Sequence, residues 1–479
     1  MDNLKKKGFI ALAWDFGGKF ANLGVKFIIS IFLTRLLEPQ EFGLIAMVNV
    51  IVGLSMVFTN MGLGASLIQR RHLLAIHYDS VFFFNLAVAF LLTTVLFFSS
   101  NLVADFYNRQ ELVAISKALS VIFVINASVT VQNTILKKEL KNETLTKSRF
   151  FAALLSGTIG IVLAYYGFGV WSLVYQSLLN GIFYAIIIWA LSNWKPMLQF
   201  SFKALKQLWG FGFRIFIAGL LNNIYTKLDI LFIGKLFSPE LLGFYQRAKS
   251  LNEMVVTFSS GSLMTVMFPV LSSVQNDNIR FKNIVDKGFK VINWVVFLFI
   301  GILFLSSRDI YIILFTEKWL PSLPFFRILL ATAFVYPLSA LLVNVLGSKG
   351  NSKAFLQLEI IKKVLATSSF IAFFVGGIWG FLYTQAIVSI ISLLINMVYA
   401  SKEIKVKISF FIIPFIKNMI LMLTILVPLY YAISIENVYL HFLIVTILFS
   451  LIYIITSFFL KITGFEFLMS ELQNRKNKI

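Results

Sequence analysis

Apolar stretches of roughly 20 residues recur along the whole chain, and this is the length of helix that crosses a membrane. Short polar segments separate them. The pattern therefore predicts an all-α, polytopic membrane protein with about 14 transmembrane helices. The predicted helices cover residues 14–36, 42–68, 80–102, 113–136, 150–166, 170–191, 211–237, 242–270, 291–305, 324–346, 354–375, 378–400, 410–432 and 439–460.

The composition supports the same class of protein and excludes several kinds of metal and disulfide site. Of the 479 residues, 59% are hydrophobic and only 13% are charged, whereas roughly a quarter are charged in soluble proteins. The chain has no cysteine, so it has neither disulfides nor thiolate metal sites. Its three histidines are too scattered for a histidine metal centre. We therefore expect no metal and no cofactor.

Several short motifs occur twice in the same order. WGFGFRI, which begins at Trp209, repeats WDFGGKF, which begins at Trp14, and places Arg214 opposite Lys19. GKLFSPELLG repeats TRLLEPQEFG at an offset of 200 residues, and GIWGFLY repeats GVWSLVY at an offset of 208. Transporters often build their sites from such homologous halves.

The repeats divide the chain into four predicted parts. Two homologous bundles of six helices are joined by a basic linker and followed by a pair of helices with a tail. These parts are residues 1–192, 193–208, 209–400 and 401–479.

Basic residues gather on alternate loops. If the N-terminus is cytoplasmic, the cytoplasmic segments hold 26 lysines and arginines, and the opposite loops hold five. The bias predicts that both termini are cytoplasmic. It also explains the net charge of +21 without nucleic acid, which we exclude as a partner. One opposite segment, residues 316–324, is expected to be an external loop or an interfacial turn anchored by Trp319.

Charged side chains within the apolar stretches indicate the candidate site. Polar residues at bilayer depth usually line a cavity or an ion path, and a cavity with excess positive charge attracts anions such as phosphate or diphosphate. The predicted substrate-binding cations are Lys19, Lys26, Arg214, Lys227, Arg247 and Lys249. The predicted polar lining, which includes candidates for ion coupling, is Asp15, Asn22, Asn223, Asp229, Glu253 and Glu359.

Helix geometry sets a condition on this site. Arg214 and Lys227 are 13 residues apart, which is about 220° around an ideal helix. Both side chains face one cavity only if the helix bends, and Gly210, Gly212, Gly219 and Gly234 would permit a bend.

The motifs together resemble a known family. TRLLEPQEFGLIAMV, MGLGASLIQRR, LKKELK and GFGVWSLVYQ are similar to the polysaccharide-exporter branch of the multidrug/oligosaccharidyl-lipid/polysaccharide flippase superfamily. The nearest likeness is to the Wzx-type exporters of colanic and teichuronic acid. The resemblance implies a V-shaped pair of six-helix bundles that works by alternating access.

The resemblance also implies a function. Such a flippase is not an enzyme; it moves an undecaprenyl-diphosphate-linked oligosaccharide across the bacterial inner membrane for lipopolysaccharide, capsule or exopolysaccharide synthesis. The expected partners are that glycan, membrane lipid, H⁺ or Na⁺ as the coupling ion, and the polysaccharide polymerase machinery. Cations of the first and seventh helices would receive the diphosphate, and Lys19, Lys26, Arg214 and Lys227 are the candidates by region.

Two alternatives stay open. A cation-coupled multidrug antiporter of the same superfamily would favour an acidic cavity, whereas the charges here are mainly basic. A membrane glycan polymerase or ligase would need a positioned acid or base, whereas the external segments are short and carry few acids.

Overall fold

The computed structural model describes the backbone of residues 2–476 and the side chains of residues 17–18, 20–259, 267–470 and 473. Throughout this described part the regular structure is helical. The chain forms two compact units, Met1–Gln246 and Arg247–Ile479.

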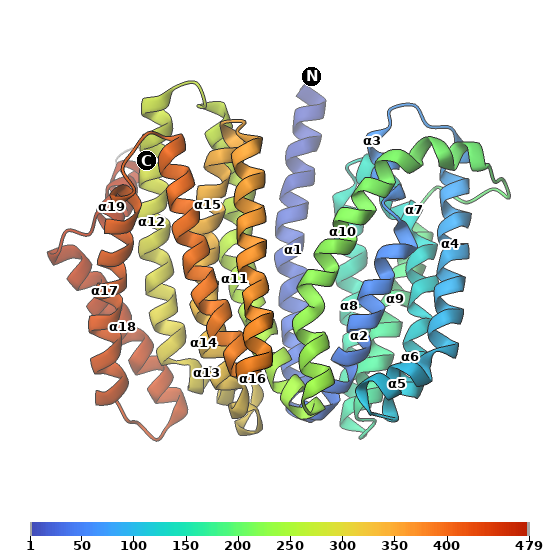
Figure 1. Cartoon of the computed structure of the whole chain (residues 1–479), viewed down its shortest axis with the longest axis horizontal. Coiled ribbons are helices and arrows are strands. Elements are labelled where there is room, and N and C mark those ends of the chain that lie inside the picture. The colour runs from blue at the N-terminus through green and yellow to red at the C-terminus, as the bar shows by residue number, and fades with distance from the viewer. Residues whose placement is uncertain (1, 477–479) are drawn as a thin grey trace. The chain divides into compact units, whose positions relative to one another are not determined.

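The first unit contains ten helices and the start of an eleventh. In it α1 packs on α8, α4 packs on α7, and α10 packs on α2 and α3. Figure 1 shows α1 and α10 on one side of this unit and α4 on the opposite side. The helices are α1 (Asp2–Leu36), α2 (Pro39–Asn60), α3 (Leu63–Gln69), α4 (Ala75–Phe98), α5 (Ser100–Tyr107), α6 (Glu111–Ser120), α7 (Ile122–Lys138), α8 (Asn142–Tyr165), α9 (Val170–Leu191), α10 (Phe202–Leu236) and α11 (Pro239–Ser273).

The second unit contains the rest of α11 and the helices that follow. Its core surrounds α12, which packs on α15, α17, α18 and α19. At one close approach, a Cβ added to Gly301 of α12 would lie 2.0 Å from the ring of Phe449. The helices are α12 (Asn278–Leu305), α13 (Ser307–Phe315), η1 (Glu317–Ser322), α14 (Leu323–Ala333), α15 (Val335–Ser348), α16 (Ser352–Glu403), α17 (Ser409–Ala432), α18 (Val438–Phe459) and α19 (Thr463–Lys476).

Membrane-length helices confirm the predicted class. Within the described residues, 11 helical segments are long and apolar enough to cross a membrane. One of them, α16, has 52 residues and consists of two helices joined at a kink at Gly377, each long enough for one crossing. Both α1 and α11 have 35 residues and include positions outside the described side chains. The count of about 14 spans stays a prediction.

Helix boundaries repeat at the predicted offset of 200 residues. α1 ends at Leu36 and α2 begins at Pro39, while α10 ends at Leu236 and α11 begins at Pro239. Proline suits the first turn of a helix because its fixed φ is helical and the N–H that it lacks would have no partner there. The same turn chemistry therefore ends the first helix of each half.

The second repeated motif has a repeated backbone conformation. Gly169 precedes α9 with φ 54° and ψ −133°, and Gly377 interrupts α16 with φ 58° and ψ −150°. These angles are accessible almost only to glycine. Gly377 thus marks the break between the predicted spans 354–375 and 378–400, which are two helices joined at a kink at this residue.

Three segments differ in detail from the sequence-based expectation. The predicted span 42–68 is broken at Met61 and Gly62, which have φ of 40° and 69°. Residues 202–208 of the predicted linker are already the start of α10. Residues 317–322 form a 3-10 helix, and Trp319 is completely buried, so it does not anchor an interface.

Packing and sequence homology divide the chain at different places. The repeats put α10 at the start of the second half, but its packing puts it in the first unit. The close approach of Gly62 to α10 explains this, since a Cβ on Gly62 would lie 2.1 Å from the carbonyl oxygen of Gly212.

The Gly377 conformation leads to a stability prediction. Gly377→Ala is expected to destabilise the protein by about 1–3 kcal/mol, because alanine is strained at a φ of 58°. Thermal unfolding in detergent measures the change. Gly376→Ala is the matched control, since no atom lies within 4 Å of its added Cβ. Equal melting temperatures for the two variants would contradict the assignment.

Candidate functional site

The turns that follow α1 and α10 contact each other reciprocally. A Cβ added to Gly43 would lie 1.7 Å from the carbonyl oxygen of Pro239, and one added to Gly243 would lie 1.8 Å from that of Pro39. Only glycine allows backbones this close. The repeated Pro and Gly positions therefore join the ends of α1 and α10 through a symmetric contact.

This contact gives the candidate cations comparable depths along their helices. Lys26 is ten residues before the end of α1, and Lys227 is nine before the end of α10. At 1.5 Å per residue, they lie about 15 Å and 14 Å from the joined ends. Arg214, 22 residues before the end of α10, lies about 33 Å away. The cations thus form two levels along the unit.

Arg214 and Lys227 have different surroundings on α10. The Arg214 side chain is exposed, and its Nε donates to the carbonyl oxygen of Gly210 in the same helix (3.0 Å). Lys227 is half-buried, and its Cε lies 3.9 Å from the position of a Cβ on Gly53 in α2. α10 bends in its first part, where it runs across one end of the unit before turning along its side (Figure 1). Such a bend is the condition under which both side chains can face one cavity.

On α1, the candidate residues whose side chains the structure describes are Asn22 and Lys26. Lys26 is exposed, and Asn22 is half-buried and donates to the carbonyl oxygen of Gly18 (2.9 Å). Gly18 itself lies against Thr146 of α8, so this part of α1 packs closely on α8. Asp15 and Lys19 lie outside the residues whose side chains the structure describes.

Two polar candidates on α10, Asn223 and Asp229, form hydrogen bonds within the protein. Asp229 is 6% exposed, and its Oδ2 accepts a hydrogen bond from the hydroxyl of Tyr245 in α11 (2.6 Å). Asn223 donates to the carbonyl oxygen of Gly219 (3.1 Å). Tyr245 is a partner that the sequence did not indicate, because the repeat has Ile45 at the matching position.

Arg247 occupies an aromatic pocket in the second unit. It is buried, and its guanidinium carbon lies 5.1 Å and 5.3 Å from the ring centroids of Phe315 and Trp319. Such cation–π contacts stabilise a buried cation. Burial raises the pKa of the nearby Tyr311 phenol, and the charge of Arg247 only partly offsets this, so Tyr311 remains neutral.

The other candidates of the second unit are separate from this pocket. Lys249 is half-buried and Glu253 is exposed, both on α11. Glu359 forms an ion pair with Lys362 one turn later on α16. Within the described residues, no group of three or more His, Cys, Asp or Glu side chains could hold a metal ion.

The open faces of α1 and α10 therefore carry cations, whereas the described carboxylates Asp229 and Glu359 have partners of their own. Only 17% of the most apolar, membrane-length part of α10 is buried. Exposed cations at bilayer depth are costly unless water or an anion meets them. This arrangement is suited to binding an anionic group.

The sequence has recognised relatives. Residues 32–324 match the family described as "Polysaccharide biosynthesis protein". The chain is 26% identical over 361 residues to the teichuronic acid biosynthesis protein TuaB of Bacillus subtilis, covering 74% of each chain. It is 22% identical over 405 residues to the lipopolysaccharide biosynthesis protein WzxC of Escherichia coli, covering 81% of each chain. The succinoglycan biosynthesis transport protein ExoT of Rhizobium meliloti is 21% identical over 358 residues, which are 75% of this chain and 72% of ExoT.

Solved structures share the fold at low sequence identity. The lipid II flippase MurJ in an inward closed conformation aligns with a TM-score of 0.72 and 15% identity, covering 93% of this chain and 99% of MurJ. An inward-facing multidrug transporter of the MATE family aligns with a TM-score of 0.59 and 15% identity, covering 81% and 98%. The chain therefore shares its fold with these two transporters.

Proposed function

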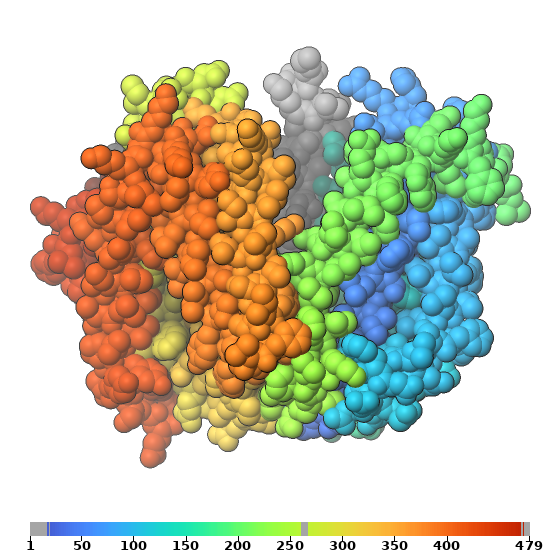
Figure 2. All heavy atoms as spheres, viewed as in Figure 1, coloured from blue at the N-terminus to red at the C-terminus, as the bar shows by residue number. Residues whose placement is uncertain are grey.

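Because the chain belongs to the polysaccharide biosynthesis protein family, we propose that it moves a polyprenyl-diphosphate-linked oligosaccharide across the membrane. One observation carries the proposal: the exposed faces of α1 and α10 present Lys26 and Arg214, and α10, which is open at the surface in Figure 2, is long and apolar enough to cross a membrane. The names of the relatives support it, since they include a polysaccharide transport protein and the fold neighbour is a lipid flippase.

The proposed mechanism uses the two levels of cations. Arg214 receives the diphosphate, and Lys26 and Lys227, which share the other level, bind it as the substrate moves along α10. An arginine fork and a lysine point charge both suit phosphate oxygens. The polyprenyl tail stays in lipid, so only the charged and sugar-bearing part needs a polar path. We place Lys19, the repeat counterpart of Arg214, on this path as well.

Alternating access would open the path first to one side and then to the other. The reciprocal contact between Gly43 and Pro239, and between Gly243 and Pro39, is the closed end of the path in this conformation. The excess of basic residues in alternate loops supports an inner-membrane protein with both termini cytoplasmic, so the closed end faces outward.

A proton or sodium gradient is the proposed energy source, and the polysaccharide polymerase machinery is the proposed consumer of the product. Asp229 is the candidate acid on α10, where its Oδ2 accepts a hydrogen bond from the hydroxyl of Tyr245. Asp15, Glu253 and Glu359 are the remaining candidates. The catalytic alternative finds no support, because transfer of a glycan is not what the names of the transport and flippase relatives describe.

Translocation in proteoliposomes tests the function. A polyprenyl-diphosphate oligosaccharide with a fluorescent glycan is placed inside, and an external quencher reports its arrival outside. The protein is expected to raise the rate above that of empty liposomes, and collapse of each ion gradient in turn identifies the coupling ion. Absence of movement, together with exchange of a small organic cation for protons, would establish the antiporter instead.

A further inference from the structure

A second charged pocket lies wholly within the second unit, far along the chain from the cations described above. It has a volume of about 730 Å³ and is lined by α12, α13, α14 and the hairpin between α17 and α18. Two arginines, Arg308 and Arg327, line it together with apolar side chains such as Leu305, Ile433 and Val445. We propose that this pocket binds the phosphate group of a membrane lipid.

Arg327 is held ready for an anion. Its Nε donates to Ser307 Oγ (2.9 Å), and its guanidinium carbon lies 5.1 Å and 5.6 Å from the ring centroids of Phe304 and Tyr430. These contacts fix the guanidinium plane and leave its terminal nitrogens for a ligand. Among the described residues, neither Arg327 nor Arg308 has a carboxylate within ion-pair distance.

The acids around the pocket do not cancel this charge. Asp309 is 1% exposed, and its Oδ2 accepts a hydrogen bond from Nδ1 of His441 (2.6 Å). Because it is buried and bonded to His441, this carboxylate is not available to pair with the two arginines. Glu436 is the one exposed acid among the lining residues. Two guanidinium groups and one carboxylate leave the lining positive.

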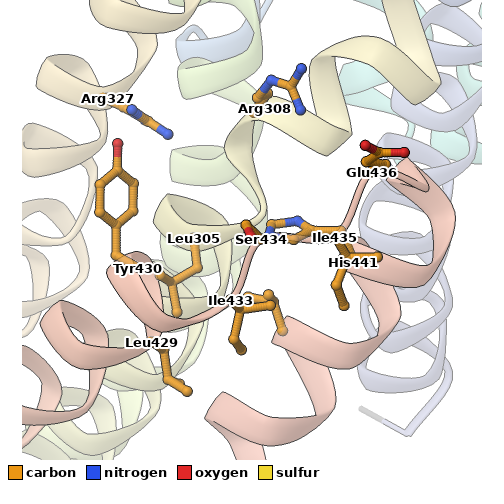
Figure 3. Close-up of a pocket in the computed structure, with 11 residues that line it drawn as sticks. Leu305, Arg308, Arg327, Leu429, Tyr430, Ile433, Ser434, Ile435, Glu436 and His441 are labelled. Atoms are coloured by element: carbon orange, nitrogen blue, oxygen red, sulfur yellow. The ribbon is translucent and has the colours of Figure 1, made fainter.

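The two sides of the pocket differ in polarity. Figure 3 shows Arg308, Arg327 and Glu436 along one side, and Leu429 and Ile433 along the opposite side. A free anion would leave the apolar side in water. An amphiphile satisfies both sides, because its phosphate binds the arginines and its chain covers the aliphatic groups.

Aromatic residues place the pocket at the level of lipid headgroups. Tyr431 and Tyr439 flank the hairpin and are 81% and 65% exposed, and Tyr430 lines the pocket itself. Exposed tyrosines gather where the apolar core of a membrane meets its headgroups. The neighbouring turns of α17 and α18 are also covered with exposed apolar side chains, including Val427 and Leu440. Lipid phosphate is thus the anion nearest to the two arginines.

Binding of defined lipids to the full-length protein in neutral detergent tests the proposal by native mass spectrometry. Phosphatidylglycerol is expected to bind more tightly than phosphatidylcholine with the same chains. Arg308→Ala should weaken phosphatidylglycerol about tenfold, the loss expected for one charge-assisted hydrogen bond. Arg327→Lys, which keeps the charge and removes the planar fork, should also weaken it. Glu436→Gln should strengthen it.

Arg280→Ala is the matched control, because Arg280 is an exposed arginine at the opposite end of α12. A polyprenyl diphosphate competes in a second arm: displacement of phosphatidylglycerol identifies the carrier lipid as the phosphate source, and no displacement identifies bulk phospholipid. Either result supports binding of a lipid phosphate in the pocket. Equal binding of phosphatidylcholine, equal effects of Arg308→Ala and Arg280→Ala, or inorganic phosphate binding as tightly as lipid would overturn the proposal. The assay measures binding alone, so its outcome does not depend on translocation.

Discussion

Combined Lys26→Glu and Arg214→Glu substitutions are expected to abolish translocation. Both side chains are exposed, so the reversal changes the charge of the α1 and α10 faces without breaking internal packing. Each charge-assisted hydrogen bond to a diphosphate contributes about 1.5–3 kcal/mol. Loss of two should slow transport at least about a hundredfold, since 1.4 kcal/mol corresponds to a factor of ten. The proteoliposome assay measures the rate, and thermal unfolding confirms that the variant is folded.

Lys203→Glu with Lys206→Glu is the control for this experiment. These lysines are also exposed and also lie on α10, but they precede the predicted span that begins at residue 211. Their reversal makes the same change in net charge and should leave the rate within about twofold, as expected for surface charges. If both pairs slow transport equally, net charge and not the position of the cations explains the effect.

Gly43→Val is expected to prevent closure of the end where α1 and α10 meet. A Cβ at this position would lie 1.7 Å from the backbone oxygen of Pro239, and backbone cannot rotate away as a side chain can. Overpacking of this kind costs about 1–3 kcal/mol, which shifts a conformational equilibrium by roughly ten- to a hundredfold. We expect transport to fall by a similar factor because the closed state is part of the cycle.

A cysteine pair reports the closed state directly. The natural chain has no cysteine, so Gln40→Cys with Glu240→Cys introduces the only pair. Both positions are exposed and follow the contacting prolines. The pair should crosslink in the unmodified background and lose most of that yield with Gly43→Val. Gly24→Val, which meets open space in α1, should keep it. Undiminished crosslinking with Gly43→Val would contradict the proposal that this contact is the closed end of the path.

The repeat and its turns were predictable because they depend on local chemistry. Proline at the start of a helix and glycine at a close contact have few substitutes, so their spacing persists when the surrounding sequence changes. Leu36 and Leu236 accordingly end matching helices, and Gly169 and Gly377 share one unusual conformation. The sequence did not indicate that the two turns touch each other, since this depends on the packing of α10 against α2.

The partners of charged residues were less predictable. Trp319 looked like an interfacial anchor because tryptophan is common at membrane surfaces, but it lies buried beside Arg247. Asp229 binds Tyr245 across a turn that carries no signal for the pairing. The angular separation of Arg214 and Lys227 was predictable from ideal helix geometry, whereas the exposure of Arg214 and the nearness of Lys227 to Gly53 of α2 were not. Arg308 and Arg327 line one pocket only because the α17–α18 hairpin supplies the rest of its lining.

Photocrosslinking of the substrate tests the central claim most directly. A polyprenyl-diphosphate oligosaccharide carries a photoreactive group on the sugar next to the diphosphate and is bound to the purified protein in nanodiscs. Mass spectrometry then locates the adducts. The account predicts adducts on α1 between residues 19 and 26 and on α10 between residues 214 and 227, reduced by Lys26→Glu with Arg214→Glu. Adducts confined to other helices, or adducts unaffected by that reversal, would contradict it.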